Sequence, residues 1–311
     1  MAKGYLGIDT SNYTTSCAVF RAGGVVQQKR LLPVPQGQVG LRQSDAVFSH
    51  IKALGELIEK LRTEESGPIS AIGVSSRPRD VEGSYMPCFL SGVTAARTAA
   101  AAMGVNIHYF SHQAGHVAAA LFGSGRLDLV DKSFTAFHLS GGTTECLWVK
   151  SLPDADIELI SHTNDLNAGQ IVDRVGHILG LDFPAGPALE KLAAESARKF
   201  KIKPSFNGDN PCLSGIENQC AAMLKRNEPH EDIALFALKS IEAALIKMAD
   251  NAKEKTGCRN MVFAGGVMSN AIIRAEIEKR FDGIFSPPQF SSDNAAGIAV
   301  LTALKEGEKL F

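Results

Sequence analysis

Two histidines, His112 and His116, stand four positions apart in the stretch SHQAGHV, where the sequence predicts the start of a helix. Residues four apart are neighbours on one helical face, so both imidazole rings can hold the same metal ion. A zinc protease helix of the H-E-x-x-H type has this spacing, with a glutamate as general base. Gln113 occupies that position here and cannot act as a base, so the pair indicates metal binding without protease chemistry. The alternative is that both histidines are structural.

A third metal ligand must come from elsewhere in the chain. Asp293 is the candidate, because it begins a predicted helix after the loop SPPQFSS. Two imidazoles and one carboxylate leave open positions for water or substrate oxygens. This donor set suits iron(II) or zinc better than magnesium, which prefers oxygen ligands.

Two loops place small and hydroxyl-bearing residues at the ends of apolar strands. The run SGGTT contains Ser140, Gly141 and Gly142, and successive backbone N–H groups in such a loop can cradle a phosphate. Asp9 and Ser11 follow the first apolar strand in a similar arrangement, which makes them candidate nucleotide contacts. The alternatives are a plain Gly-Gly hairpin turn in the first case and a capped turn in the second.

Three further positions are candidate contacts for a nucleoside. In FAGGV an apolar strand runs through two glycines into a helix, where a nucleotide can lie against the helix N-terminus. Asn270, one turn further on, can hydrogen-bond a base or ribose, or else faces solvent. Asp173 can accept hydrogen bonds from ribose hydroxyls, or else pairs with His177 or another cation. Gly186 lies in the rigid turn PAGP, which would flank the same ligand.

The elements that would position these residues alternate between strands and helices, which favours an α/β fold. Apolar residues at helical spacing predict helices at 45–61 and 89–103. Strands are expected at 5–9, 16–20, 25–32, 69–74, 105–110, 134–139, 145–149 and 261–264, and further helices at 168–179, 186–199, 232–255, 270–280 and 293–305. The segment 203–214 is the most irregular.

Both halves of the chain open with a strand, a small-residue loop and a second strand. The sequence therefore predicts a duplicated α/β core with a central cleft between two lobes, where a ligand would bind. We place the N-terminal lobe at residues 1–110 together with 294–311, and the C-terminal lobe at residues 111–293.

The composition is that of an ordinary globular protein, with 311 residues, 45% hydrophobic and 21% charged. No apolar run reaches the roughly 18 residues that span a bilayer, and the N-terminus lacks a signal-peptide pattern. The six cysteines form no C-x-x-C pair, which favours the reducing cytoplasm. Because the net charge is only −1, a nucleic acid would need a local basic patch. The basic run at 198–203 is a candidate, although such runs are often solvated helix ends.

In their order and spacing these motifs resemble the tRNA threonylcarbamoyladenosine transferase family, formerly called O-sialoglycoprotein endopeptidases. The resemblance covers nearly the whole chain. The matching stretches are YLGIDTSNYTT, SHQAGH, HLSGGTTE, GQIVDRVGHILGLDFPAGPALEKLA, LSGIEN, FAGGVMSN and SSDNAAGIA. The resemblance implies the two-lobed actin/hexokinase/Hsp70-like ATPase fold.

The resemblance also implies ligands and their contacts. It implies a metal at His112, His116 and Asp293, phosphate contacts from Ser140, Gly141 and Gly142, and nucleotide contacts from Asp173, Gly186 and Asn270. In the family the metal coordinates the phosphate of threonylcarbamoyl-adenylate. The threonylcarbamoyl group is transferred to N6 of adenosine 37 in tRNAs that read ANN codons. The implied partners are an adenine nucleotide (ATP or threonylcarbamoyl-adenylate), tRNA and the proteins of a threonylcarbamoyl-transfer complex, without a membrane. No catalytic side chain is assigned.

The chain departs from the family pattern around the implied site. NYT at 12–14 stands where the family usually has Cys-Asp-Glu or Cys-Asp-Asp, and RPRD at 77–80 replaces Gly-Pro-Gly-Leu. Ala114 and Thr143 stand where the family has glutamate and, often, histidine. These changes fit a divergent paralogue. The leading hypothesis is a metal-dependent threonylcarbamoyltransferase; the alternatives are a paralogous carbamoyltransferase with another acceptor and a nucleotide-binding regulatory protein without catalysis.

Overall fold

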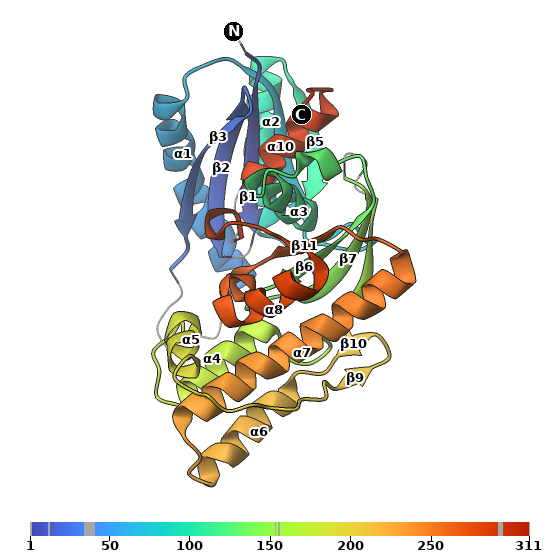
Figure 1. The fold of residues 1–311 in the computed structure, drawn as a ribbon. Helices are drawn as coiled ribbons and strands as arrows, with labels where there is room; N and C mark the ends of the chain where they lie inside the picture. Colours follow the sequence, from blue (N-terminus) through green and yellow to red (C-terminus); the bar gives the residue numbers. More distant parts are fainter. Residues whose placement is uncertain are drawn as a thin grey trace. The chain divides into compact units, whose positions relative to one another are not determined.

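The computed structural model describes residues 2–11, 13–33, 41–152, 154, 156–291 and 295–310. Its contacts group the chain into two compact units. Unit 1 consists of residues 1–132, 151–157 and 289–311, and unit 2 of residues 133–150 and 158–288. Each unit is built on a five-stranded sheet with helices packed on it (Figure 1).

The sheet of unit 1 has the strand order β3-β2-β1-β4-β5. Its strands are β1 (Gly4–Ser11), β2 (Thr14–Arg21), β3 (Gly24–Leu31), β4 (Ile69–Arg77) and β5 (Asn106–Ser111). The first three strands form an antiparallel meander, whereas β4 runs parallel to β1 and β5 runs parallel to β4. Ala22 and Gly23 both have positive φ, 50° and 79°, which suits the tight hairpin turn between β2 and β3.

Helices cover both faces of this sheet, because successive side chains of a strand point to opposite faces. Leu6 and Ile8 pack with α1 (Gln43–Glu64) and α2 (Phe89–Met103). Tyr5 packs with α10 (Ala296–Lys305) on the other face. A Cβ atom on Gly7 would lie only 2.5 Å from the backbone nitrogen of Ala299, so β1 and α10 are in close backbone contact.

Helix α3 (His112–Gly123) packs tightly on α10. A Cβ on Gly297 would lie 1.8 Å from the carbonyl oxygen of Gly115, so this pair of helices requires glycine at their contact. For this reason residues 111–132 group with unit 1, whereas the sequence placed them in the C-terminal lobe. The predicted lobe boundaries and the compact units therefore differ at this segment.

The sheet of unit 2 has the corresponding order β12-β11-β6-β7-β8. Its strands are β6 (Phe134–Leu139), β7 (Thr144–Ser151), β8 (Asp156–His162), β11 (Met261–Ala264) and β12 (Ile284–Phe285). β6 and β7 are antiparallel, β11 runs parallel to β6, and β12 runs parallel to β11. Three strands consecutive in sequence followed by two parallel strands recur in the same spatial order in both units, which confirms the predicted duplicated α/β core.

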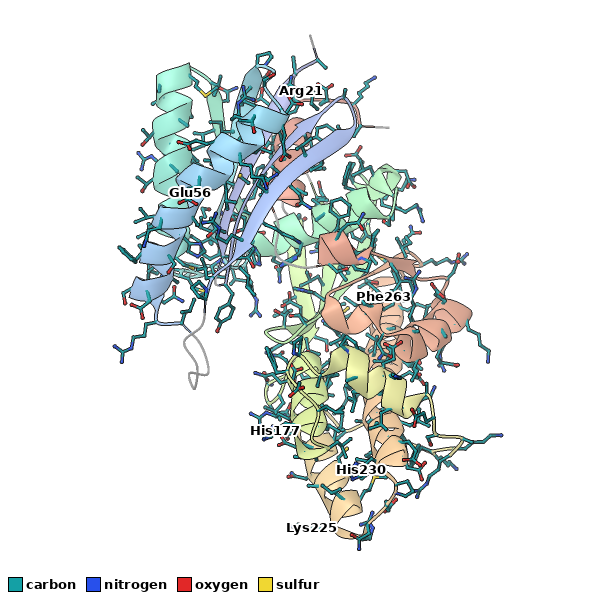
Figure 2. The ribbon with its side chains drawn as sticks, turned by 90° about the vertical axis from the view of Figure 1, so that its left-hand side faces the viewer. Arg21, Glu56, His177, Lys225, His230 and Phe263 are labelled. Atoms are coloured by element: carbon teal, nitrogen blue, oxygen red, sulfur yellow. The ribbon has the colours of Figure 1, made fainter. Side chains whose placement is uncertain are left out.

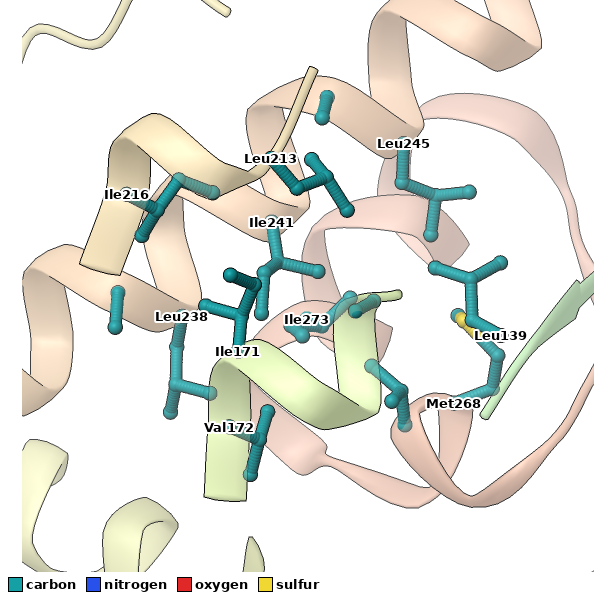
Figure 3. Packing of buried hydrophobic residues seen from close by; sticks show 14 of the residues in the cluster. Leu139, Ile171, Val172, Leu213, Ile216, Leu238, Ile241, Leu245, Met268 and Ile273 are labelled. Carbon is teal, nitrogen blue, oxygen red and sulfur yellow. The ribbon is translucent and has the colours of Figure 1, made fainter. Parts of the chain in front are cut away.

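Helices supply most of the core of unit 2. They are α4 (Ala168–Ile178), α5 (Gly186–Ala193), α6 (Ser214–Lys225), α7 (His230–Thr256) and α8 (Ala271–Phe281). The long helix α7, orange in Figure 1, contacts the other four. Ile171, Leu238 and Ile273 bring α4, α7 and α8 together in one apolar cluster (Figure 3). Phe263 of β11, labelled in Figure 2, stacks on Phe137 with ring centroids 4.8 Å apart.

The remaining elements are short. They are the 3-10 turns η1 (Leu127–Leu129) and η2 (Gly266–Ser269), the strands β9 (Phe206–Asn207) and β10 (Asn210–Pro211), and helix α9 (Pro288–Ser291). β9 and β10 form a small hairpin within the segment predicted to be irregular. Among the residues described, no helix combines the length and apolar character needed to cross a membrane.

Two predicted helices need correction, and the sequence analysis also missed two elements. The helix expected over 186–199 ends at Ala193, because the chain then turns toward α7, where the Ser196 hydroxyl donates to the Asp232 carboxylate at 2.5 Å. Helix α6 and strand β8 were not predicted. The last helix begins at Ala296 rather than at Asp293, and Asp293 itself lies outside the described residues.

Asp165 ties the loop before α4 to the start of α6. Its carboxylate accepts hydrogen bonds from the backbone N–H groups of Leu213 and Ser214, both at 3.0 Å, and from the Thr163 hydroxyl at 2.6 Å. Burial raises the pKa of this carboxyl, but the hydrogen bonds outweigh burial and hold its pKa well below the usual range. Because the pKa of Asp165 is lower in the folded than in the unfolded protein, its ionised carboxylate stabilises the fold. This contribution to the free energy of unfolding is fully present above the unfolded-state pKa of about 4 and is lost as the pH falls below it.

Asp165→Asn is accordingly expected to lower the free energy of unfolding by about 1 kcal/mol at neutral pH, a value that allows for solvent screening of this exposed carboxylate. The difference from the wild type should shrink as the pH falls below about 4, because the wild-type carboxylate then loses its advantage. Urea denaturation of both proteins across this pH range measures it. A difference that stays constant with pH would contradict the role of the charge.

Candidate nucleotide and metal sites

A cavity of about 570 Å³ lies within unit 2. Five residues proposed from the sequence line it, although they come from four separate stretches of the chain; they are Ser140, Gly141, Asp173, Gly186 and Asn270. The volume falls in the range typical of small-molecule sites, which is about 300–1,000 Å³. The cavity therefore brings together most of the predicted nucleotide contacts in one place.

The turn after β6 is held by its own hydrogen bonds. The backbone N–H of Ser140 donates to the Thr143 carbonyl at 2.7 Å, and the Ser140 hydroxyl oxygen accepts from the N–H groups of Gly142 (3.3 Å) and Thr143 (3.1 Å). These two N–H groups already have a partner within the turn. Gly142 is not among the residues that line the cavity, whereas Gly141 is.

Glycines shape the cavity in two different ways. A Cβ on Gly169 would lie 2.5 Å from the backbone nitrogen of Gly141, so α4 can approach the turn only with glycine there. Gly265, with φ of 98°, would place a Cβ 2.2 Å from the Leu139 carbonyl oxygen. By contrast, a Cβ on Gly141 or Gly266 would meet no atom within 4 Å, and both residues line the cavity. Gly169 and Gly265 are thus required by packing, whereas Gly141 and Gly266 leave space for a ligand.

Asp173 joins α4 to the turn that precedes α5. Its Oδ1 atom accepts a hydrogen bond from the backbone N–H of Ala185 at 3.0 Å. A Cβ on Gly176, one turn along α4, would lie 2.2 Å from the Cβ of Ala185, so helix and turn are closely packed. Within the described part of the chain Asp173 forms neither an ion pair nor a hydrogen bond with His177. Its second oxygen is the one that can accept from a ligand in the cavity.

Asn270 is the N-cap residue of α8. Its Oδ1 accepts from the backbone N–H of Ile273 at 3.1 Å, which leaves the Nδ2 group as the donor that can serve a ligand. Glu190 also lines the cavity and accepts from the N–H of Ala271 at 3.1 Å. The sequence analysis did not propose Glu190. It stands four residues after Gly186, so both lie on one face of the short helix α5, and this spacing could have indicated that Glu190 faces the same cavity.

The two histidines lie in unit 1, in the first turns of α3. Their Nε2 atoms are 2.8 Å apart, and their ring centroids 4.3 Å apart. Ser111 caps this helix by accepting from the N–H of Ala114 at 3.1 Å. Both rings therefore lie on one face of the helix, as their spacing predicted, with their Nε2 atoms within hydrogen-bonding distance of each other.

A buried carboxylate orients the first histidine. Nδ1 of His112 lies 3.0 Å from Oδ2 of Asp9, a residue that is only 1% exposed. With the proton on Nδ1 shared with Asp9, the lone pair of His112 lies on Nε2, the atom that faces His116. Carboxylate–histidine pairs of this kind orient metal-binding imidazoles, and two such nitrogens fit a divalent transition metal. Among the described residues no group of three or more His, Cys, Asp or Glu could hold a metal, so Asp293 as third ligand stays a prediction.

Asp9 and Ser11 are absent from the lining of the cavity in unit 2. The Ser11 hydroxyl donates to Oδ2 of Asp9 at 3.1 Å, and the Ser75 hydroxyl donates to Oδ1. Both oxygens of the Asp9 carboxylate are therefore engaged within unit 1, next to His112. The expected contact of Asp9 and Ser11 with a nucleotide stays a prediction, whereas the position of Asp9 points to orientation of the histidine.

The loop RPRD at residues 77–80 holds the first turn of α3. The Asp80 carboxylate accepts from the Ser111 hydroxyl and from the guanidinium of Arg77. The carbonyl oxygen of Pro78 accepts from the N–H of Gln113 at 3.1 Å. This loop thus fixes the start of the helix that carries both histidines.

Comparison with known proteins supports the same class of fold. The solved structure of HypF from T. kodakarensis superposes with a TM-score of 0.65 at 14% identity, over 99% of this chain and 47% of that one. Together with related solved structures, it places the chain among proteins of the actin/hexokinase/Hsp70-like ATPase fold.

The sequence comparisons define the family within this class. The model of the tRNA N6-adenosine threonylcarbamoyltransferase family matches residues 36–300, and the chain belongs to this family. A tRNA N6-adenosine threonylcarbamoyltransferase of Sorangium cellulosum is 29% identical, over 96% of this chain and 91% of that protein. A protein of Thermoplasma volcanium, named a probable bifunctional tRNA threonylcarbamoyladenosine biosynthesis protein, is 25% identical over 94% of this chain, which spans 55% of its length.

Proposed function

We propose that the chain is a metal-dependent transferase that moves the threonylcarbamoyl group of threonylcarbamoyl-adenylate to N6 of adenosine 37 in tRNA. The observation that carries this proposal is the cavity of unit 2 in a chain that belongs to this family. The cavity is lined by candidate nucleotide contacts from four places: the turn after β6, α4, α5 and the start of α8. In the reaction, N6 bonds to the carbamoyl carbon, the bond from that carbon to the phosphate oxygen breaks, AMP leaves and one N6 proton is released.

Different residues of the cavity would bind different groups in the adenosine part of threonylcarbamoyl-adenylate. The second carboxylate oxygen of Asp173 accepts from ribose hydroxyls, and the Nδ2 group of Asn270 donates to the base or ribose. The open sides of Gly141 and Gly266 leave room for the ligand. Hydrogen bonds that involve a charged group contribute about 1.5–3 kcal/mol each, so Asp173 is expected to dominate the affinity.

His112 and His116 would hold the metal, with Asp9 orienting His112 and Asp293 as the further ligand. When bound, a divalent ion supplies positive charge that stabilises phosphate oxygens. Imidazole donors favour iron(II) or zinc over magnesium. All six cysteines are free, which agrees with a place in the reducing cytoplasm, the compartment that we propose for this protein.

The purified chain alone is expected to threonylcarbamoylate tRNA slowly, and partner proteins are expected to accelerate it. One reason is that NYT and RPRD replace the loops usual in the family. A second reason is that the Thermoplasma relative, which is named as bifunctional, is a longer protein of which this chain spans 55%. The measurement is nucleoside mass spectrometry of a tRNA that reads ANN codons, after incubation with threonylcarbamoyl-adenylate, with and without desalted extract of the native cells. Fast transfer by the pure chain would contradict the dependence on partners, and no transfer in either reaction would contradict the function.

A further inference from the structure

An extended segment of unit 2 carries a regular row of lysines. Residues 196–205, which we call the lysine segment, connect α5 to β9 and belong to no helix or sheet. Side chains alternate along it: Lys199, Lys201 and Lys203 are exposed. Phe200 and Ile202 between them are partly buried, and Phe200 packs edge-on against Phe236 of α7 with ring centroids 5.3 Å apart.

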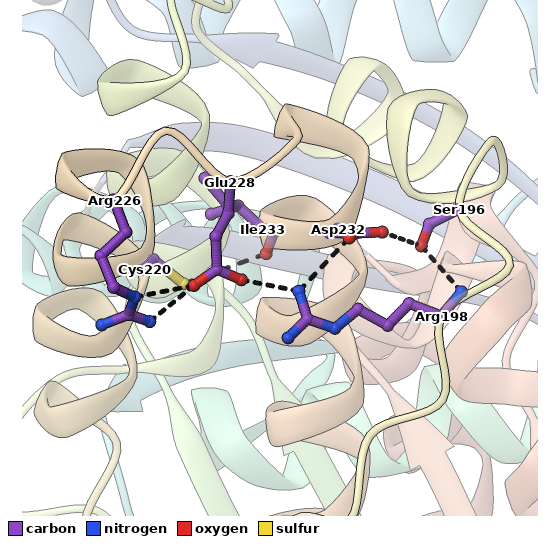
Figure 4. Close-up of polar contacts among 7 residues, drawn as sticks. All are labelled: Ser196, Arg198, Cys220, Arg226, Glu228, Asp232 and Ile233. Carbon is purple, nitrogen blue, oxygen red and sulfur yellow. Dashed lines mark hydrogen bonds and ion pairs between the residues drawn. The ribbon is translucent and has the colours of Figure 1, made fainter.

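Ion pairs anchor the start of this segment to the first turn of α7 and to the loop before it. The guanidinium of Arg198 lies 2.6 Å from the Glu228 carboxylate and 3.3 Å from that of Asp232 (Figure 4). It also lies over the ring of Phe200, 4.9 Å from the ring centroid. Arg226 donates to the same Glu228 at 2.7 Å. Both arginines are therefore partly neutralised by carboxylates, and the ion pairs of Arg198 hold the start of the segment in place.

The three lysines differ from these arginines. In the described part of the chain, none of Lys199, Lys201 and Lys203 forms an ion pair. An extended chain advances about 3.3 Å per residue, so lysines two residues apart lie about 7 Å apart along the segment. A nucleic-acid strand carries one negative phosphate per nucleotide, so a row of lysines at this regular spacing can contact several phosphates of one strand.

The outward row also lacks the groups that other partners require. Lys199, Lys201 and Lys203 are exposed whereas Phe200 and Ile202 are partly buried, so the row itself offers neither the aromatic anchors of a protein interface nor the apolar face of a membrane-bound segment. Regularly spaced positive charge on an anchored backbone suits a regularly spaced polyanion. The net charge of the whole chain is −1, so this is a local feature.

We propose that Lys199, Lys201 and Lys203 form a contact surface for the phosphate backbone of the tRNA substrate. This proposal rests on the proposed function for the identity of the nucleic acid. It assigns these lysines to backbone positioning rather than to sequence recognition, because phosphate contacts carry no sequence information.

The test is the salt dependence of tRNA binding, measured by fluorescence anisotropy for the full chain and for a variant with Lys199→Gln, Lys201→Gln and Lys203→Gln. Each phosphate contact contributes a slope of about 0.7 to 0.9 in the plot of log affinity against log salt, so the variant should lose a slope of about 2 to 3. Its affinity at low salt should fall at least about tenfold, while its affinity for AMP stays that of the wild type.

A matched control removes three other exposed lysines of α7, which form no ion pair with any residue that the structure describes: Lys247→Gln, Lys253→Gln and Lys255→Gln. The control should keep the wild-type slope. An unchanged slope in the first variant, or an equal loss in both variants, would overturn the proposed surface and leave the proposed function standing. Absence of tRNA binding by the wild-type chain, with AMP still bound, would overturn the surface together with tRNA as acceptor.

Discussion

Replacement of His116 by alanine is expected to lower the affinity of the chain for iron(II) or zinc by more than about 100-fold. The reason is that loss of an outer partner of a metal ligand alone costs about 10–100-fold, and loss of the ligand itself should cost more. His116 presents its Nε2 atom 2.8 Å from that of His112, so the variant keeps only one of two converging nitrogens. Metal analysis of the purified protein after reconstitution and dialysis measures the effect.

Two further variants make this test specific. Asp9→Asn should weaken metal binding by about 10–100-fold, because the amide no longer offers a charged acceptor to Nδ1 of His112. His177→Ala should leave metal binding unchanged, since His177 is exposed on α4 in unit 2 (Figure 2). Equal metal content in the wild type and in His116→Ala would show that the two histidines only pack.

Asp173→Asn is expected to weaken the binding of AMP by about 10–100-fold without unfolding the protein. Asparagine retains an oxygen that can accept from the N–H of Ala185, so the link between α4 and the turn before α5 persists. It replaces the second, charged oxygen by an amide that cannot accept from ribose, which removes about 1.5–3 kcal/mol of hydrogen bonding. Isothermal titration calorimetry of both proteins with AMP gives the ratio of dissociation constants.

The matched control for this experiment is Asp209→Asn, an exposed aspartate of unit 2 that does not line the cavity. It should bind AMP as the wild type does, and both variants should unfold at the wild-type temperature. If Asp173→Asn also binds AMP with wild-type affinity, the carboxylate of Asp173 makes no ligand contact and its role is confined to the turn.

The candidate site could be predicted from the sequence where residue type and local spacing decide the outcome. The interval of four residues between His112 and His116 is a property of one helix, and the structure keeps both rings on one face. The small residues that follow two apolar strands also allowed the sequence to place Gly141 just after the end of β6 and Asn270 shortly after the end of β11. Their gathering in one cavity follows from the arrangement of β6 next to β11 in the sheet.

Contacts between distant parts of the chain could not be predicted in this way. Nothing near Asp9 in the sequence indicates that its carboxylate meets a ring 103 residues later, and the same holds for Asp80 and Ser111. The end of α5 is another case. The residues after Ala193 still favour a helix, but the chain leaves the helix and Ser196 hydrogen-bonds to Asp232 of α7. In each case a tertiary hydrogen bond decides the local structure.

The most direct test of the central claim, that the cavity of unit 2 binds the adenosine part of the adenylate, is photoaffinity labelling with an azido-substituted AMP followed by mass spectrometry of the labelled peptides. The proposed site predicts labels within residues 184–194 and 265–274, two stretches that contain residues lining the cavity, and predicts that unmodified AMP suppresses them. Labels confined to unit 1 or to other surfaces of unit 2, or labels that AMP does not suppress, would contradict it.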